Sequence, residues 1–100
     1  MAYVAGSLDE TIAAAAGDDP VLFAELKRAF IESLDRQIDL LHRSRCDANW
    51  EMAAQRLRGV AASFHAEAVI ALAEEALDGA PGDPVVLRRL RQFRQAFVAA

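Results

Sequence analysis

The chain lacks the features of a disulfide-bonded, zinc-binding, membrane-spanning or β-sheet protein. Its single cysteine, Cys46, cannot form an internal disulfide, and its two histidines do not combine with it into a zinc-binding spacing. Five glycines and three prolines in 100 residues are too few turn signals for a β-sandwich. No apolar run is long enough to span a bilayer. The alanine run 13–16 has no basic flank before it, so it is not a secretion signal. These absences predict a small helical domain, which we expect in the cytoplasm of a bacterial cell.

The chain is also short of positive charge. Eleven Lys and Arg stand against 15 Asp and Glu, which gives a net charge of −4. A nucleic-acid-binding domain would carry a basic surface, so we expect neither nucleic acid nor membrane among its partners. The hydrophobic share of 54% is enough for one modest core in a chain of this length. We therefore predict one domain over residues 1–100, with no cofactor and no metal ion.

Capping residues predict where the first two helices begin. Ser7 and Glu10 have the spacing of a capping box, which predicts a short helix from Ser7 to about residue 16. Asp19 and Pro20 suit the N-cap and first position of a second helix that continues to about residue 45. Apolar residues recur through it at three- and four-residue steps: Phe23, Leu26, Phe30, Leu34, Ile38 and Leu41.

Three further helices are expected at about 50–64, 66–78 and 84 to nearly 100. A connection at 46–49 and a turn at 79–84 separate them. The short connections and narrow apolar stripes predict an all-α fold. Its form would be an antiparallel up-down four-helix bundle with a short extra N-terminal helix.

The last helix carries four arginines, Arg88, Arg89, Arg91 and Arg94. They spread around more than half of its circumference, and cationic side chains suit the C-terminal half of a helix. This distribution favours a solvated face over a site for an acidic partner.

The helix expected at 50–64 has a glycine in its interior. Gly59 in an exposed helix costs about 1 kcal/mol relative to alanine, so its presence calls for a reason. Gln55 and Gly59 lie one turn apart, each about 160° around the helix from the core-facing Leu57. A glycine in such a place is typical of a site that another backbone approaches closely.

The residues around Gly59 resemble a known family, the histidine-containing phosphotransfer (HPt) domains of two-component phosphorelays. The family's motif reads His-x-Leu-Lys-Gly, followed by small residues, an apolar residue and Gly-Ala. Residues 55–66 of this chain read QRLRGVAASFHA, with the leucine, glycine, small run, apolar residue and final alanine in register. Gln55 takes the place of the phosphoryl-accepting histidine, and His65 takes the place of the late glycine. The chain is thus similar to a degenerate member of the family.

The resemblance implies a partner, either a response-regulator receiver domain or a hybrid histidine kinase. It places Arg58 as the cation beside a phosphoryl group and Gly59 as the point of close approach. An amide nitrogen is not a basic nucleophile, so Gln55 cannot accept a phosphoryl group but can still donate hydrogen bonds. We therefore expect docking without phosphotransfer, no catalytic residue and no enzyme activity. The candidate partner-binding residues are Met52, Gln55, Arg56, Arg58, Gly59, Ala62 and Ser63.

Several alternatives remain open from the residues alone. The domain could be a structural bundle that forms a homodimer through a flat patch of Met52, Gly59 and Ala62. Phosphotransfer could proceed through His65 or His42, or Gln55 could be an engineered replacement of a histidine. At His65 the helix either ends with a left-handed backbone conformation or continues, and a histidine at a helix end also complements the helix dipole.

Overall fold

The computed structural model describes residues 5–99, which fold entirely into α-helices and their connections. Within these residues there is no β-strand, which confirms the predicted all-α class. In chain order the helices are α1 (Ala5–Ala16), α2 (Pro20–Arg43), α3 (Asp47–Ser63), α4 (Glu67–Asp78) and α5 (Pro84–Ala99).

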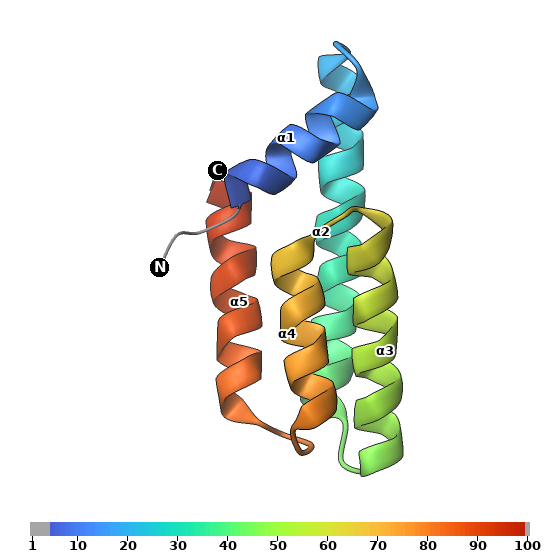
Figure 1. The fold of residues 1–100 in the computed structure, drawn as a ribbon, viewed down its shortest axis with the longest axis vertical. Helices are drawn as coiled ribbons and strands as arrows, with labels where there is room; N and C mark the ends of the chain where they lie inside the picture. The colour runs from blue at the N-terminus through green and yellow to red at the C-terminus, as the bar shows by residue number, and fades with distance from the viewer. Residues whose placement is uncertain (1–4, 100) are drawn as a thin grey trace.

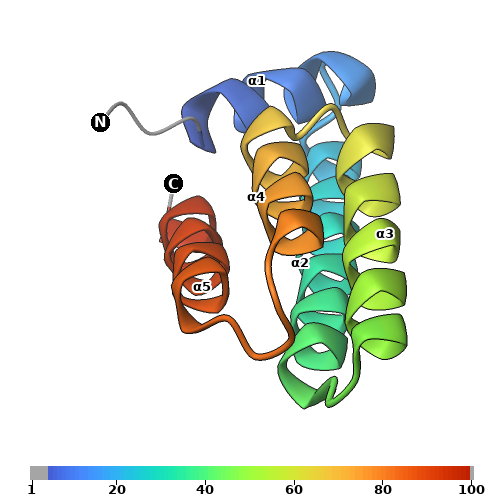
Figure 2. The ribbon, with the colours of Figure 1, turned by 60° about the horizontal axis from the view of Figure 1, so that its bottom comes forward.

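Sequential helices from α2 to α5 run antiparallel and lie side by side (Figure 1). Helix α2 packs against α3 and α5, and α4 packs against the same two helices, so α3 and α5 are diagonal and do not contact each other. Helix α1 crosses one end of this group and contacts α2 and α5 (Figure 2). The particle measures 44 × 26 × 18 Å.

The core is apolar throughout the described residues, with no buried polar side chain. Each helix contributes one stripe at helical spacing, as the sequence predicts. Near the C-terminal ends of α3 and α5, the ring of Phe30 contacts the rings of Phe64 and Phe97 edge to face, at centroid distances of 4.9 and 5.5 Å. Leu8 and Ile12 of α1 are buried over the same end of the core. Burial of this kind stabilises a fold by about 25 cal/mol per Å² of apolar surface.

Two predicted helix starts are confirmed by their hydrogen bonds. The carboxylate of Asp19 accepts from the backbone N–H groups of Val21 and Leu22, at 2.9 and 3.2 Å. That of Asp83 accepts from the N–H of Val85, at 2.9 Å. Because proline at the first helical position has no N–H to satisfy, each Asp-Pro pair starts a helix at low cost.

The predicted start of the first helix is wrong. Helix α1 begins at Ala5 rather than Ser7. A residue that already lies inside a helix has helical backbone angles, whereas an N-cap needs extended ones, so Ser7 is not the cap of a capping box.

Two more boundaries differ from the sequence prediction. Helix α2 ends at Arg43 because Ser44 caps it. The N–H of Ser44 donates to the Leu41 carbonyl and its hydroxyl to the Leu40 carbonyl. Helix α3 begins at Asp47, three residues earlier than predicted, and places that carboxylate in its first turn, where the helix dipole favours negative charge.

Candidate functional site

The seven candidate partner-binding residues form one exposed surface on α3, called here the α3 face. At about 100° per residue they fall within roughly 160° of the helix circumference. All of them are exposed: Met52, Gln55, Arg56, Arg58, Gly59, Ala62 and Ser63. The structure therefore brings the predicted residues together on a single open side of the helix.

The opposite side of α3 fixes the orientation of this face. Trp50, Ala53, Ala54, Leu57 and Ala61 are all buried. The indole Nε1–H of Trp50 donates to the backbone carbonyl of Ala76 in α4, at 2.7 Å. This hydrogen bond and the apolar packing set the rotation of α3, and with it the direction in which the α3 face points.

Gly59 lies in a regular helical position with free space beside it. Its backbone φ is not positive, so no left-handed conformation requires a glycine. A Cβ added at this position would meet nothing within 4 Å, so no close helix packing requires one either. The fold thus offers no reason of its own for a residue that weakens the helix.

Gln55 lies one turn before Gly59 and is exposed. Its side-chain amide has no hydrogen-bond partner in the part of the chain that the structure describes. It can present both an N–H donor and a carbonyl acceptor to a bound molecule.

Arg58 marks the edge of the α3 face next to α4. Its Nε lies 3.6 Å from a carboxylate oxygen of Glu74, and the two side chains are 47% and 53% exposed. An ion pair this exposed is worth at most about 1 kcal/mol, so a stronger anion could replace Glu74 as the partner of Arg58. The sequence did not reveal this pairing, because it depends on the register between α3 and α4.

Met52 and Arg56 mark the opposite edge, next to α2. Together with Leu40, Arg43 and Ser44 they line a cavity of about 310 Å³ between α2 and α3. The side chain of Met52 is 50% exposed. Sequence reasoning missed the cavity, although an apolar methionine on a polar helix face was a signal for it.

Ser63 and Ala62 complete the α3 face at the C-terminal end of the helix. The hydroxyl of Ser63 donates to the carbonyl of Val60, at 2.8 Å, so it is engaged within its own helix. Such local bonds are common for serine near helix ends. Ala62 adds a small apolar surface beside Gly59.

His65 ends the helix with a left-handed backbone, at φ 56°. Its N–H donates to the Ala62 carbonyl, and the N–H of Ala66 donates to the Ala61 carbonyl, at 3.1 and 2.8 Å. These two bonds form a Schellman motif, in which glycine is the usual residue. The alternative of a continuous helix through His65 is wrong.

The two histidines are exposed, and the C-terminal ends of α2 and α3, which carry them, lie at opposite ends of the helical group (Figure 1). His65 lies between α3 and α4, while His42 lies near the C-terminal end of α2. They therefore cannot act on one substrate atom together.

Two other kinds of site are absent from residues 5–99. No three His, Cys, Asp or Glu side chains gather as a metal ion would require. No helix there is long and apolar enough to cross a membrane. Comparisons with family models, curated proteins and solved structures found no match to this chain.

Proposed function

We propose that this chain is an HPt-like signalling module that docks a response-regulator receiver domain without accepting its phosphoryl group. In this proposal α2 to α5 form an antiparallel up-down four-helix bundle, and α1 is the extra N-terminal helix. The receiver, alone or as part of a hybrid histidine kinase, contacts the α3 face. The domain acts in the cytoplasm as a binding partner or competitor and catalyses no reaction.

One observation carries the proposal, namely the open space beside Gly59. Neither backbone conformation nor internal packing requires a glycine there. The missing side chain instead lets an outside backbone come close to α3, next to the exposed amide of Gln55. This is the arrangement that the resemblance to the phosphotransfer family implies.

The flanking residues supply the contacts that docking needs. Arg58 and Arg56 lie on the two sides of the strip from Gln55 to Gly59, toward α4 and α2 respectively. A receiver active site is rich in carboxylates, which guanidinium groups bind with charge-assisted hydrogen bonds. Met52 adds an apolar contact at the α2 edge.

Receiver binding by the unmodified chain and two variants tests the proposal. Receiver domains encoded in the same genome should bind the unmodified chain saturably, and Gly59→Trp should weaken binding at least about tenfold by filling the open space. Ala24→Trp adds the same bulk at an exposed position of α2 away from the α3 face and should have no effect. Equal binding by the folded Gly59→Trp protein would contradict the proposal.

Placing a histidine at position 55 tests why the chain does not accept a phosphoryl group. Gln55→His should accept labelled phosphate from a phosphorylated receiver in the presence of Mg²⁺, as an acid-labile phosphohistidine. The unmodified chain should remain unlabelled. Label on the unmodified chain that disappears in His65→Gln or His42→Gln would instead identify one of those histidines as an acceptor.

Self-association is a second candidate, favoured by the half-exposed side chain of Met52 beside Gly59 and Ala62. These residues add exposed apolar surface to the α3 face. Sedimentation velocity distinguishes the two functions, because a dimer through this area should dissociate in Ala62→Arg. A protein that is monomeric at high concentration removes this candidate.

A further inference from the structure

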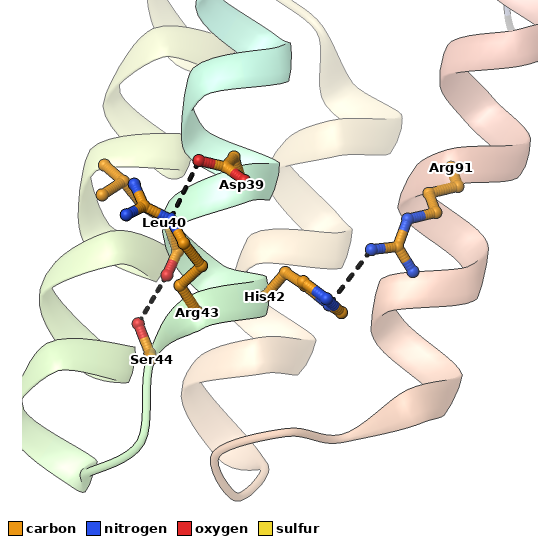
Figure 3. A network of polar contacts seen from close by, with 6 residues as sticks. All are labelled: Asp39, Leu40, His42, Arg43, Ser44 and Arg91. Carbon is orange, nitrogen blue, oxygen red and sulfur yellow. Dashed lines mark hydrogen bonds and ion pairs between the residues drawn. The ribbon is translucent and has the colours of Figure 1, made fainter.

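A second candidate site lies between α2 and α5, beside the turn that leads into α5. A cavity of about 580 Å³ opens there, lined by His42 of α2 and by Arg88, Arg91, Gln92 and Gln95 of α5. Figure 3 shows His42 and Arg91 pointing toward each other across the space between the two helices. This volume is within the range of small-molecule sites in proteins, about 300–1,000 Å³.

The structure divides the four arginines of α5 into two kinds. Arg89 pairs with Glu75, at 2.8 Å, and Arg94 makes two hydrogen bonds to Asp35, at 2.6 and 3.0 Å. Arg88 and Arg91 form no ion pair with any carboxylate in residues 5–99. They are three residues apart on α5 and therefore project from the same side of it. The sequence predicted a solvated face for these arginines but did not reveal this division.

His42 adds a third donor to the cavity. A guanidinium nitrogen of Arg91 lies 3.2 Å from Nδ1 of His42. Arginine has only donors, so in this hydrogen bond Nδ1 is the acceptor and the N–H of the ring is the one at Nε2. The contact thus leaves His42 with an N–H donor and occupies only part of the Arg91 guanidinium.

Nearby carboxylates do not cancel this positive charge. Asp35 and Asp39 line an adjoining cavity with His42 and Arg91. Asp35 is held by Arg94, and Asp39 pairs with Arg43 at 3.0 Å. The charges of Arg88 and Arg91 therefore remain uncompensated, although the chain as a whole has a net charge of −4.

We propose that the cavity between α2 and α5 binds a phosphate group, either as the free ion or as a phosphomonoester. One arginine fork is enough for the two coplanar oxygens of a carboxylate, whereas a phosphate offers several oxygens in tetrahedral directions. Those oxygens can accept from Arg88, Arg91 and His42 together. The cavity is much larger than a phosphate ion, and the buried side chain of Leu87 gives it an apolar wall suited to an organic substituent.

This site is independent of receiver docking. It is built from α2 and α5, and α5 does not contact α3. Gly59 of α3 and the arginines Arg88 and Arg91 of α5 therefore lie on helices that do not touch, and either function can fail without the other.

Titration of the full-length, ¹⁵N-labelled chain tests the site, with inorganic phosphate and phenyl phosphate as separate probes. Saturable shifts are expected for the backbone amide of Gly82 and the side-chain amides of Gln92 and Gln95. Arg91→Gln and Arg88→Gln should each weaken binding about tenfold or more, the usual effect of losing a charge-assisted hydrogen bond. Arg89→Gln is the matched control, because it removes the same charge from the same helix outside the cavity.

Each outcome of this titration is decisive. Tighter binding of phenyl phosphate identifies a phosphomonoester as the ligand, and equal binding identifies the free ion; both support the proposal. Binding that Arg88→Gln/Arg91→Gln does not change, or that Arg89→Gln weakens as much, would overturn it. Acetate and vesicles that contain phosphatidic acid are titrated in the same way as further probes. Acetate binding as tight as phosphate, or binding to the vesicles alone, would also overturn the proposal. Circular dichroism checks that each variant is folded.

Discussion

The indole of Trp50 donates a hydrogen bond to the carbonyl of Ala76, at 2.7 Å, and so joins α3 to the last turn of α4. The same carbonyl accepts from the N–H of Gly79, which caps α4. One backbone oxygen thus serves both the end of α4 and the orientation of α3. Since the α3 face is on the other side of α3, its direction depends on this buried contact.

Replacing Trp50 by phenylalanine should destabilise the protein by about 1–3 kcal/mol. The substitution removes the hydrogen bond and leaves a small void, while Ala76 keeps Gly79 as a donor. Urea denaturation followed by circular dichroism measures the change. Met52→Ala, at a half-exposed position of the same helix, is the control and should cost much less. An unchanged midpoint for Trp50→Phe would show that the contact contributes nothing.

Gly59→Ala should stabilise the protein by about 0.5–1 kcal/mol. Alanine is the better helix former, and the added Cβ meets nothing within 4 Å. Gly82→Ala is the matched control and should destabilise the protein instead, because Gly82 has φ 82°. Thermal unfolding of both variants checks the two signs. A loss of stability in Gly59→Ala would mean that the helix does require a glycine there.

His65→Gly should also be stabilising, by up to about 1 kcal/mol. A non-glycine residue in the left-handed region is strained, and glycine relieves this strain without breaking the Schellman hydrogen bonds. His65→Ala keeps the strain and serves as the comparison in the same unfolding experiment. If the glycine variant is no more stable than the alanine variant, backbone strain at this position is negligible.

Asp35→Asn should lower stability by no more than about 1 kcal/mol, because the Asp35 and Arg94 side chains are each about 40% exposed. The hydrogen bond from Arg94 to Asp35 and then the charge of Asp35 raise the pKa of Arg94 above its usual value. A group with a raised pKa adds stability that is complete below its unfolded pKa and is lost as the pH rises through its folded pKa. For an arginine the unfolded and the folded pKa both lie at strongly alkaline pH. The stability that Arg94 gains from Asp35 should therefore not change between about pH 6 and pH 9.

Urea unfolding across that interval measures the effect. Asp39→Asn, which breaks the more exposed pair with Arg43, is the control and should cost less. A cost of several kcal/mol for Asp35→Asn would show that the pair is far better shielded from solvent than its exposure indicates.

Hydrophobic periodicity was sufficient to predict the number and order of the helices and most of their buried positions. Phe30, Leu34 and Leu41 of α2 are fully buried as predicted, because an amphipathic stripe must face the core wherever its helix packs. The Asp-Pro starts of α2 and α5 were also predictable, since their capping bonds are local in sequence.

Contacts between helices could not be predicted from the sequence. The pairing of Arg58 with Glu74 and the division of the α5 arginines depend on the rotation and register of neighbouring helices. The shared role of the Ala76 carbonyl depends on them too. The early start of α1 was missed for a different reason, because Ser7 matches a capping motif that helix formation at Ala5 overrides.

Because α3 and α5 occupy diagonal corners and never touch, a macromolecule seated on one and a small anion held by the other would not collide. Any influence between the two would have to travel through α2 or α4, each of which contacts both α3 and α5. A ternary assembly is therefore sterically allowed.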